Sequence, residues 1–275
     1  MSEDILDRPA PPAGARIAYG PAPQQFGELR LPPGAGPHPV VVAIHGGFWR
    51  ARYGLGYFGH ACAALTVAGT ATWNIEYRRL GDPGGGWPGT FQDVALAVDH
   101  LRTLAEPYAL DLTRLITFGH SAGGHLALWA AGRARIPASS SVLPPAGPAQ
   151  PLPVRAAVAL AGVCDLRQAW ERRLSDGVVR ELMGGTPDEA PERYDAGSPR
   201  ALLPLGVSQI LIHGTADETV PYALSQGYHA AARAAGDAAT LLTLPDAGHF
   251  ETVDPTTPEW HTVLRATLPL LGLAG

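Results

Sequence analysis

The sequence contains no lysine, so arginine supplies all 20 of its basic side chains. Together with 25 acidic residues, these give a formal net charge of −5. A protein that binds nucleic acid needs basic residues gathered on one surface to contact the phosphates. The acidic balance therefore predicts that nucleic acid is not a partner.

Cysteine is also scarce, because the chain has only Cys62 and Cys164. Two cysteines cannot build the disulfide framework of a small secreted domain. Cys62 lies in an apolar helical stretch and Cys164 follows a predicted strand, and we expect both to pack in the core. His120 and His125 have no second ligand at metal-binding spacing, so we predict no metal site.

Long apolar runs are missing as well. No stretch approaches the roughly 20 apolar residues that a membrane-spanning helix needs. The segment Met1–Pro9 is acidic and lacks the apolar centre of a signal peptide. We therefore expect a cytoplasmic protein without membrane contact, whereas the sequence does not indicate its oligomeric state.

Apolar strands alternate with helical stretches along the chain. This alternation predicts one α/β domain over residues 1–275, with a mostly parallel, doubly wound sheet. Two short strands near 15–19 and 28–31 are expected to add an antiparallel edge. The other predicted strands are 40–44, 70–77, 114–119, 155–163, 209–213 and 239–244, and the helices are 55–68, 90–104, 122–133, 220–235 and 259–271.

Two segments interrupt this alternation. Residues 136–153 are rich in proline and serine, and we expect an exposed, mobile excursion without a function. Residues 164–207 lie between the strands near 155–163 and 209–213 and are too long for a simple crossover. We predict that they form an inserted cap over the active edge, and an enlarged crossover is the alternative.

A serine stands at a sharp turn between a predicted strand and a predicted helix. The apolar stretch 115–118 leads into Gly-His-Ser-Ala-Gly at 119–123, and an apolar helical stretch follows. Such a turn raises the Ser121 hydroxyl above the sheet and leaves the Ala122 N–H at a helix N-terminus. Because the turn strains the serine backbone, its neighbours must be small, as Gly119 and Gly123 are. We predict that Ser121 is a nucleophile.

Candidates for the base and the acid follow in the order Ser, acid, His. Asp217 comes just after the strand 209–213, and His249 follows the strand 239–244. The carboxyl ends of parallel strands meet at one sheet edge, so these side chains can converge with Ser121. Asp165 also follows a strand and is the rival acid. Chain order and the short separation from His249 favour Asp217.

A glycine-rich turn follows the strand 40–44. It reads His-Gly-Gly-Phe-Trp at residues 45–49. Two glycines allow successive N–H groups to point the same way, as an oxyanion hole requires. We predict that the N–H groups of Gly47, Phe48 and Ala122 bind the oxyanion. His45 is expected to support this loop through side-chain hydrogen bonds.

Together, these motifs resemble the α/β-hydrolase superfamily from about residue 15 onward. The turns at 45–49 and 119–123 are similar to those of esterase- and lipase-like members and of kynurenine formamidases. The segment 213–221 resembles the acid loop of prolyl-oligopeptidase-type peptidases. At Phe48 the chain departs from the hormone-sensitive-lipase pattern, which has a third glycine there. The resemblance implies an α/β-hydrolase fold.

The sequence thus predicts a serine hydrolase that cleaves small carboxylic esters through an acyl-enzyme. Hydrolysis of an aryl formamide such as N-formylkynurenine is the alternative. A small peptidase and a non-catalytic binding protein on the same scaffold rank lower. We expect Trp49, Trp87 and Trp170 to overhang the active edge and bind the substrate in a short acyl pocket. The expected partner is a small acyl substrate, and no cofactor is predicted.

Overall fold

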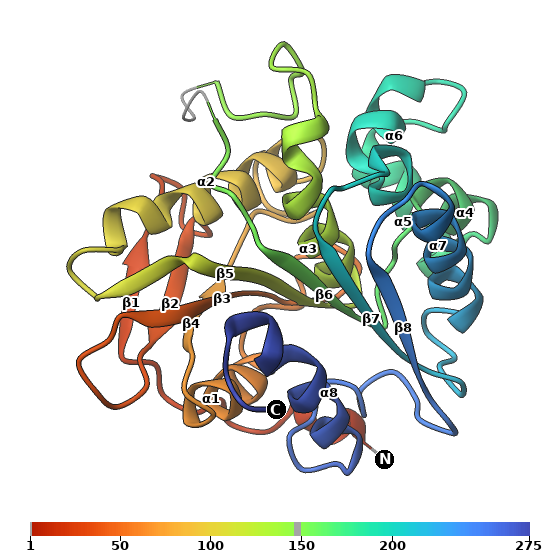
Figure 1. Cartoon of the computed structure of the whole chain (residues 1–275). Coiled ribbons are helices and arrows are strands. Elements are labelled where there is room, and N and C mark those ends of the chain that lie inside the picture. Colours follow the sequence, from red (N-terminus) through yellow and green to blue (C-terminus); the bar gives the residue numbers. More distant parts are fainter. Residues whose placement is uncertain (1, 146–149) are drawn as a thin grey trace.

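Eight strands form one sheet in the order β1-β2-β4-β3-β5-β6-β7-β8 (Figure 1). The computed structural model describes residues 2–145 and 150–275. β2 pairs antiparallel with both β1 and β4, and all the other neighbours are parallel. The predicted α/β class with an antiparallel edge is therefore confirmed. The strands are β1 (Ala15–Ala18), β2 (Phe26–Arg30), β3 (His38–Ile44), β4 (Ala71–Ile75), β5 (Leu110–His120), β6 (Ala156–Leu160), β7 (Ser208–Gly214) and β8 (Ala239–Leu244).

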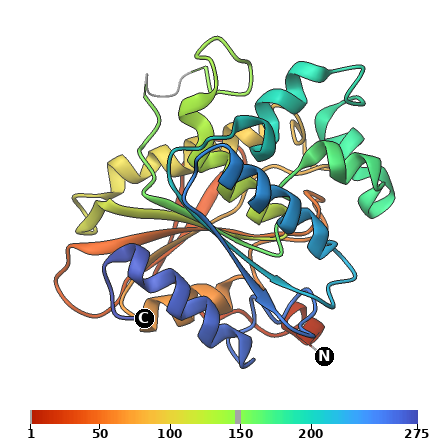
Figure 2. The same cartoon turned by 45° about the vertical axis from the view of Figure 1, so that its right-hand side comes forward.

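Helices cover both faces of the sheet (Figures 1 and 2). On one face lie α1 (Gly59–Val67) and α8 (Glu259–Thr267). The opposite face is covered by α2 (Gly89–Leu104), α3 (Ala122–Gly132) and α7 (Tyr222–Ala234). Each face has its own apolar core, because the buried side chains form two clusters, one on each side of the sheet.

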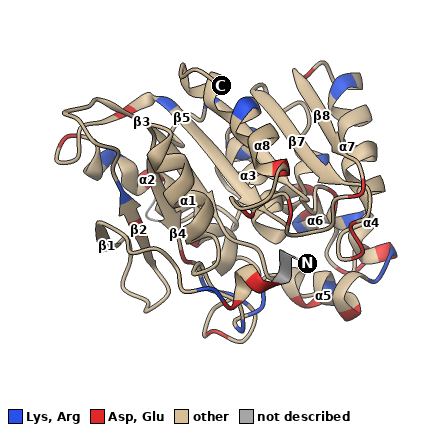
Figure 3. Cartoon of the chain, turned by 90° about the horizontal axis from the view of Figure 1, so that it is seen from below, with Lys and Arg blue, Asp and Glu red and all other residues tan. Residues whose placement is uncertain are grey.

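The composition of the inner strands explains why they lie at the centre. β3, β4 and β6 are buried along their whole length. A parallel strand covered on both faces needs apolar side chains on both, which the run Val-Val-Val-Ala-Ile at 40–44 provides. β3, β4, β6, β7 and β8 carry no Arg, Asp or Glu, and Figure 3 shows these strands free of charged residues.

The predicted insertion 164–207 forms three helices between β6 and β7. They are α4 (Leu166–Glu171), α5 (Leu174–Met183) and α6 (Pro191–Gly197), and a short 3-10 helix, η3 (Pro199–Leu202), follows them. Two side chains of α3 anchor this segment. His125 Nε2 donates to the Gly197 carbonyl at 2.8 Å, and Trp129 Nε1 donates to the Ala196 carbonyl at 2.9 Å.

Most described residues of the predicted excursion 136–153 are exposed or half-buried, its residues 146–149 lie outside the described chain, and three of its apolar side chains depart from the expectation. Ile136, Val142 and Leu152 are buried in the core on the α2 side. The Leu152 N–H also donates to the buried carboxylate of Asp99 at 2.7 Å. The apolar residues between the prolines hold this segment against the domain, because burying them removes apolar surface from water.

The longest helix of the described chain is α2, with 16 residues. A helix that crosses a bilayer needs roughly 20 mostly apolar residues. In residues 2–145 and 150–275, no helix has the length and apolar character to do so.

Candidate active site

Ser121 occupies the turn between β5 and α3 in a strained backbone conformation. Its φ is 57° and its ψ is −121°, and 2% of the residue is exposed. A positive φ costs free energy for a residue other than glycine, so this conformation persists only where the surrounding structure holds the backbone in place. Here the Ser121 N–H donates to the Leu160 carbonyl at 2.8 Å, and the His125 N–H donates to the Ser121 carbonyl at 3.2 Å. β6 and α3 therefore fix both sides of the turn.

The glycines around Ser121 are required by close backbone contacts. A Cβ on Gly119 would lie 2.0 Å from the Gly123 carbonyl oxygen, and one on Gly123 would lie 1.9 Å from the Ile44 carbonyl oxygen. A Cβ on Gly46 would lie 2.8 Å from the Ser121 Cβ. The His-Gly-Gly turn therefore packs directly against the predicted nucleophile.

Asp217 and His249 meet at the carboxyl edge of the sheet. His249 Nδ1 lies 2.7 Å from Asp217 Oδ2. Because a carboxylate only accepts hydrogen bonds, Nδ1 carries the proton and Nε2 is left as the basic nitrogen. His249 and Ser121 line the same cleft. The structure thus brings the three predicted residues to one site from the ends of β5, β7 and β8.

The Asp217 carboxyl is held in its ionised form. Burial acts to raise its pKa, but hydrogen bonds from His213 and His249, and from the Val220 N–H, outweigh burial and hold the pKa well below its usual range. The Thr219 and Val220 N–H groups both donate to Oδ1 at 2.8 Å. Asp217 is therefore a fixed negative charge beside the imidazole of His249.

His213 is a second histidine on this carboxylate, and the sequence did not indicate its role. Its Nε2 lies 3.1 Å from Asp217 Oδ2 and 2.9 Å from the Val220 carbonyl, so Nε2 carries a proton. Nδ1 then accepts a hydrogen bond from Ser225 Oγ, 2.7 Å away. Position 213 ends the predicted strand, and only the packing of α7 reveals its contact with Ser225.

The rival acid, Asp165, has a different position. It is the N-cap of α4, where its Oδ1 accepts hydrogen bonds from the Arg167 and Gln168 N–H groups at 3.0 and 3.2 Å. Its other oxygen lies 4.0 Å from Arg200. A carboxylate that caps a helix satisfies backbone donors and stabilises the helix start. The structure pairs His249 with Asp217, not with Asp165.

The predicted oxyanion donors lie in two neighbouring turns. Gly47, Phe48 and Trp49 all have positive φ, at 104°, 49° and 56°. Within the described chain, the N–H groups of Gly47, Phe48 and Ala122 donate to no other protein group. Gly47, Phe48 and Ser121 also line the same cleft. N–H groups held in this way can bind an oxygen anion that develops beside Ser121.

Buried polar side chains support the loop 45–49, which we call the oxyanion loop after its predicted role, as expected for His45. The ring of His45 lies 2.8 Å from the Gly46 carbonyl through Nδ1 and 2.8 Å from Glu76 Oε1 through Nε2. Burial acts to raise the pKa of Glu76, but contacts with His45 and Arg79 lower it. The Tyr77 hydroxyl donates to the His45 carbonyl at 2.8 Å. These hydrogen bonds hold the backbone of the loop in position.

A hydrogen-bond chain joins the oxyanion loop to His249. The Gly46 N–H donates to the Tyr57 hydroxyl at 2.8 Å, and this hydroxyl donates to His120 Nδ1 at 2.8 Å. His120 Nε2 then donates to the main-chain carbonyl of His249 at 3.0 Å. Burial, together with the nearby ionisable ring of His249, holds the pKa of His120 well below its usual range, so the His120 ring is neutral. No sequence pattern indicates this series of hydrogen bonds, because Tyr57 and His120 come into contact only in the folded protein.

These groups surround a cleft of about 430 Å³. Its lining comes mainly from the loop 45–49 and the segment after it, and from the loop that carries His249. α5 contributes one residue and the N-terminal 3-10 helix η1 (Ser2–Leu6) another. The lining residues are Leu6, Gly47, Phe48, Arg52, Tyr53, Tyr57, His120, Ser121, Ser175, Thr219, His249 and Phe250.

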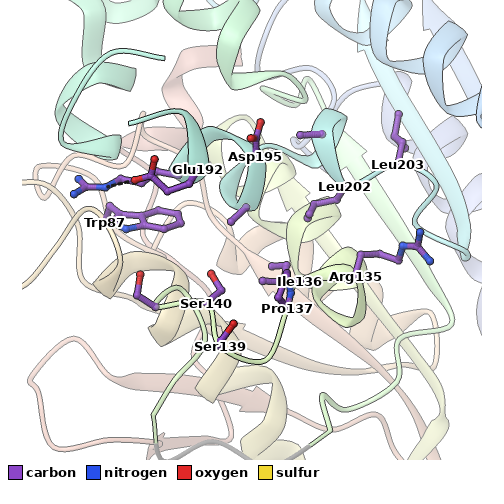
Figure 4. Close-up of a pocket in the computed structure, with 14 residues that line it drawn as sticks. Trp87, Arg135, Ile136, Pro137, Ser139, Ser140, Glu192, Asp195, Leu202 and Leu203 are labelled. Atoms are coloured by element: carbon purple, nitrogen blue, oxygen red, sulfur yellow. Dashed lines mark ion pairs between the residues drawn. The ribbon is translucent and has the colours of Figure 1, made fainter. Parts of the chain in front are cut away.

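None of the three tryptophans predicted to bind substrate lines this cleft, so that prediction is corrected. Trp49 is fully buried and packs edge-on against His125, with ring centroids 5.2 Å apart. Trp87 faces a separate cavity between α6 and residues 135–141 (Figure 4). Trp170 lines a third cavity, on the surface of α5. Large aromatic rings bury much apolar surface when they pack, and all three rings pack into or against the apolar core on the α2 side of the sheet.

The two cysteines take no part in the site. Both are buried, and burial raises the pKa of each thiol to about 12. A thiol with such a pKa stays protonated at neutral pH and is a poor nucleophile. In the described chain, no three His, Cys, Asp or Glu side chains gather as metal ligands.

Known proteins resemble this chain in sequence. The BD-FAE family model matches residues 28–231. Esterase LipQ of Mycobacterium tuberculosis is 28% identical over 215 residues, which make up 77% of this chain and 50% of LipQ. The chain therefore spans about half the length of this relative.

Solved structures resemble it over nearly the whole chain. A truncated carbohydrate esterase from gut microbiota has 22% identity and a TM-score of 0.79, covering 96% of this chain and 97% of that one. Esterase 2 of Thermogutta terrifontis with bound butyrate has 22% identity and a TM-score of 0.75, with coverage of 95% and 94%. The same esterase phosphonylated by sarin has 22% identity and a TM-score of 0.76, covering 94% of each chain. The fold is that of the α/β-hydrolases, and the family match over most of the chain shows that this protein belongs to the BD-FAE family.

Proposed function

We propose that the protein is a serine esterase that hydrolyses small carboxylic esters. The observation that carries the proposal is the 2.7 Å contact of His249 Nδ1 with Asp217 Oδ2 in a site whose cleft also holds the strained Ser121. A buried, ionised acid beside a histidine and a serine is the arrangement that activates a hydroxyl as a nucleophile.

The first half of the reaction forms an acyl-enzyme. Nε2 of His249 takes the proton of the Ser121 hydroxyl while Oγ attacks the ester carbonyl carbon. The N–H groups of Gly47, Phe48 and Ala122 bind the oxyanion, and Asp217 stabilises the imidazolium. His249 then gives its proton to the alkoxide leaving group, and the C–O bond to the alcohol breaks.

The second half releases the acid. Water enters the cleft and gives a proton to His249 as its oxygen attacks the acyl carbon. The same N–H groups bind the second oxyanion. Collapse of this intermediate breaks the bond to Ser121 Oγ, which takes the proton back from His249. The enzyme returns to its starting state, and one water is consumed per ester.

The relatives support an esterase over the other activities. LipQ is named an esterase, and the Thermogutta terrifontis esterase has been solved with butyrate and with propionate. Its phosphonylation by sarin is the behaviour expected of an activated serine. A cleft of about 430 Å³ fits a small ligand better than a long lipid chain.

A substrate panel tests the proposal. We expect kcat/KM for 4-nitrophenyl esters to fall steeply from acetate and butyrate to palmitate, with no change when EDTA is added. A flat or rising profile would rule out a short acyl site. A strong preference for N-formylkynurenine over every ester would instead assign an arylformamidase, and activity lost in EDTA and restored by a divalent metal would contradict the metal-free mechanism.

A further inference from the structure

We propose that Arg52 recognises a carboxylate on the substrate, so that the enzyme prefers esters that carry a negative charge. Arg52 lines the cleft that contains Ser121 and His249. Since the proposal names the substrate class of this site, it rests on the esterase function proposed above.

The charge of the cleft lining favours an anion. Apart from its histidines, Arg52 is the one ionisable charged side chain among the lining residues of the described chain, and no Asp or Glu is among them. The rest of the lining is aromatic, aliphatic or hydroxylic. A single positive charge with no counter-charge beside it attracts an anionic ligand and repels a cationic one.

Arginines of this segment and of the segment 78–80 that contacts it are already paired. Arg50 lies 3.4 Å from Glu181, Arg78 lies 2.6 Å from Asp93, and Arg79 lies 3.1 Å from Glu76. Within residues 2–145 and 150–275, Arg52 forms neither a salt bridge nor a side-chain hydrogen bond with the protein. All the donors of its guanidinium therefore remain available to a ligand.

Arg52 is also held in place relative to the oxyanion loop. Its guanidinium carbon lies 4.8 Å from the centroid of the Tyr53 ring, a cation–π contact. Tyr53 packs against Gly47, where an added Cβ would lie 2.4 Å from the Tyr53 Cβ. The Tyr53 carbonyl accepts a hydrogen bond from Arg79, which also pairs with Glu76. The cation thus sits on a ring that is fixed to the oxyanion loop.

The guanidinium group of Arg52 is well suited to bind a carboxylate. Its planar set of N–H donors matches the two oxygens of a carboxylate, and such charge-assisted pairs are stronger than neutral hydrogen bonds. Esters that combine a short acyl group with a carboxylate have two forms. In half-esters of short dicarboxylic acids, the carboxylate belongs to the acyl group. In hydroxybenzoic acids that are acylated on the phenolic hydroxyl, the carboxylate belongs to the leaving group.

Two matched substrate pairs test the proposal on the intact protein. Monoethyl succinate is compared with ethyl butyrate, and 4-acetoxybenzoate with its neutral methyl ester. In at least one pair, Arg52→Gln should lower kcat/KM for the anionic member about tenfold relative to the neutral one, mainly through KM. The wild-type preference should shrink as salt is added, because screening weakens exposed charges.

Arg155→Gln is the matched control. Arg155 is exposed and immediately precedes β6, at the opposite end of the strand from the site, so this variant removes the same charge far from the cleft. It should leave both ratios unchanged. If Arg52→Gln leaves the ratios unchanged while neutral esters are still hydrolysed, the role of Arg52 is wrong and the esterase proposal stands. If no member of either pair is hydrolysed, the esterase proposal fails, and this one fails with it.

Discussion

His213 donates a hydrogen bond from Nε2 to Oδ2 of Asp217 across 3.1 Å, and this is the same oxygen that His249 contacts. One carboxylate oxygen thus accepts hydrogen bonds from two imidazole rings. His213 lies at the end of β7, the strand that precedes Asp217, and His249 follows the neighbouring strand β8. Both donors lower the pKa of Asp217. We therefore expect His213 to influence the reaction through Asp217, as a positioning residue.

Replacing His213 with Gln should slow catalysis without preventing substrate binding. Loss of a hydrogen bond to a buried charge costs about 1.5–3 kcal/mol, so kcat should fall roughly 10- to 100-fold while KM changes little. His229→Gln on α7 is the control, because within the described residues its ring has one hydrogen-bond partner, the Ala239 carbonyl at 3.3 Å. Steady-state kinetics of both variants with 4-nitrophenyl acetate provide the measurement. Equal kcat values for the two variants would show that His213 has no such role.

Asp217 and Asp165 should differ sharply when each becomes asparagine. Asp217→Asn leaves an amide beside His249 and favours the wrong imidazole tautomer, which lowers kcat by about 10⁴ in well-studied triads. Asp165→Asn should change kcat little, since asparagine also caps a helix N-terminus. Circular dichroism confirms folding of each variant before the kinetic comparison. If folded Asp165→Asn is the more damaged of the two, the acid has been misassigned.

The Tyr57 hydroxyl should matter more than that of another buried tyrosine. Tyr57→Phe breaks the chain from Gly46 through His120 to His249 and leaves a buried N–H without an acceptor. We expect kcat to fall about tenfold, since an unmade buried hydrogen bond costs about 1–3 kcal/mol. Tyr228→Phe is the control, because its hydroxyl donates to Gln209 at the far end of β7. Similar kcat values in both variants would mean that the chain does not position the site.

Stability should decline below neutral pH because of His125. Burial lowers the pKa of His125 to about 4, whereas a histidine in the unfolded chain has a pKa of about 6.5. As pH falls from about 6.5 to about 4, the unfolded chain binds a proton that the folded chain does not, so the free energy of unfolding drops by about 3 kcal/mol. Above about pH 6.5 this effect is absent.

Urea unfolding at pH 7.5 and pH 4.5 measures that loss. His125→Gln keeps a donor for the Gly197 carbonyl but removes the titrating group. The stability of this variant should therefore fall less between the two pH values than that of the wild type. Identical losses would show that His125 does not carry the acid sensitivity.

Local patterns predicted the strands and the three residues of the proposed triad. Each pattern joins a strand to the turn that follows it, as at Ser121 and Asp217, and the parallel sheet brings those turns together. The close contacts of Gly119 and Gly123 likewise follow from the strained turn between β5 and α3. Such features depend on residues that are close in sequence, so they can be predicted from a single amino-acid sequence.

Other parts of the site depend on packing between distant segments. Trp49, Trp87 and Trp170 follow strands or lie in the insertion, yet none of them lines the cleft that holds Ser121. The direction of a side chain in a loop is set by its packing against distant segments, which local sequence patterns do not reveal. For the same reason, the contacts of Tyr57 with His120 and of His213 with Ser225 could not be predicted.

Covalent labelling of Ser121 tests the central claim most directly. The wild-type protein is treated with diisopropyl fluorophosphate, and the labelled residue is located by peptide mass spectrometry alongside hydrolysis of 4-nitrophenyl acetate. We predict one phosphoryl adduct, on Ser121, that forms in step with the loss of hydrolysis. Folded Ser121→Ala should bind no label and lose nearly all activity. Undiminished hydrolysis by this variant, or an adduct on another residue that abolishes activity, would contradict a mechanism based on Ser121.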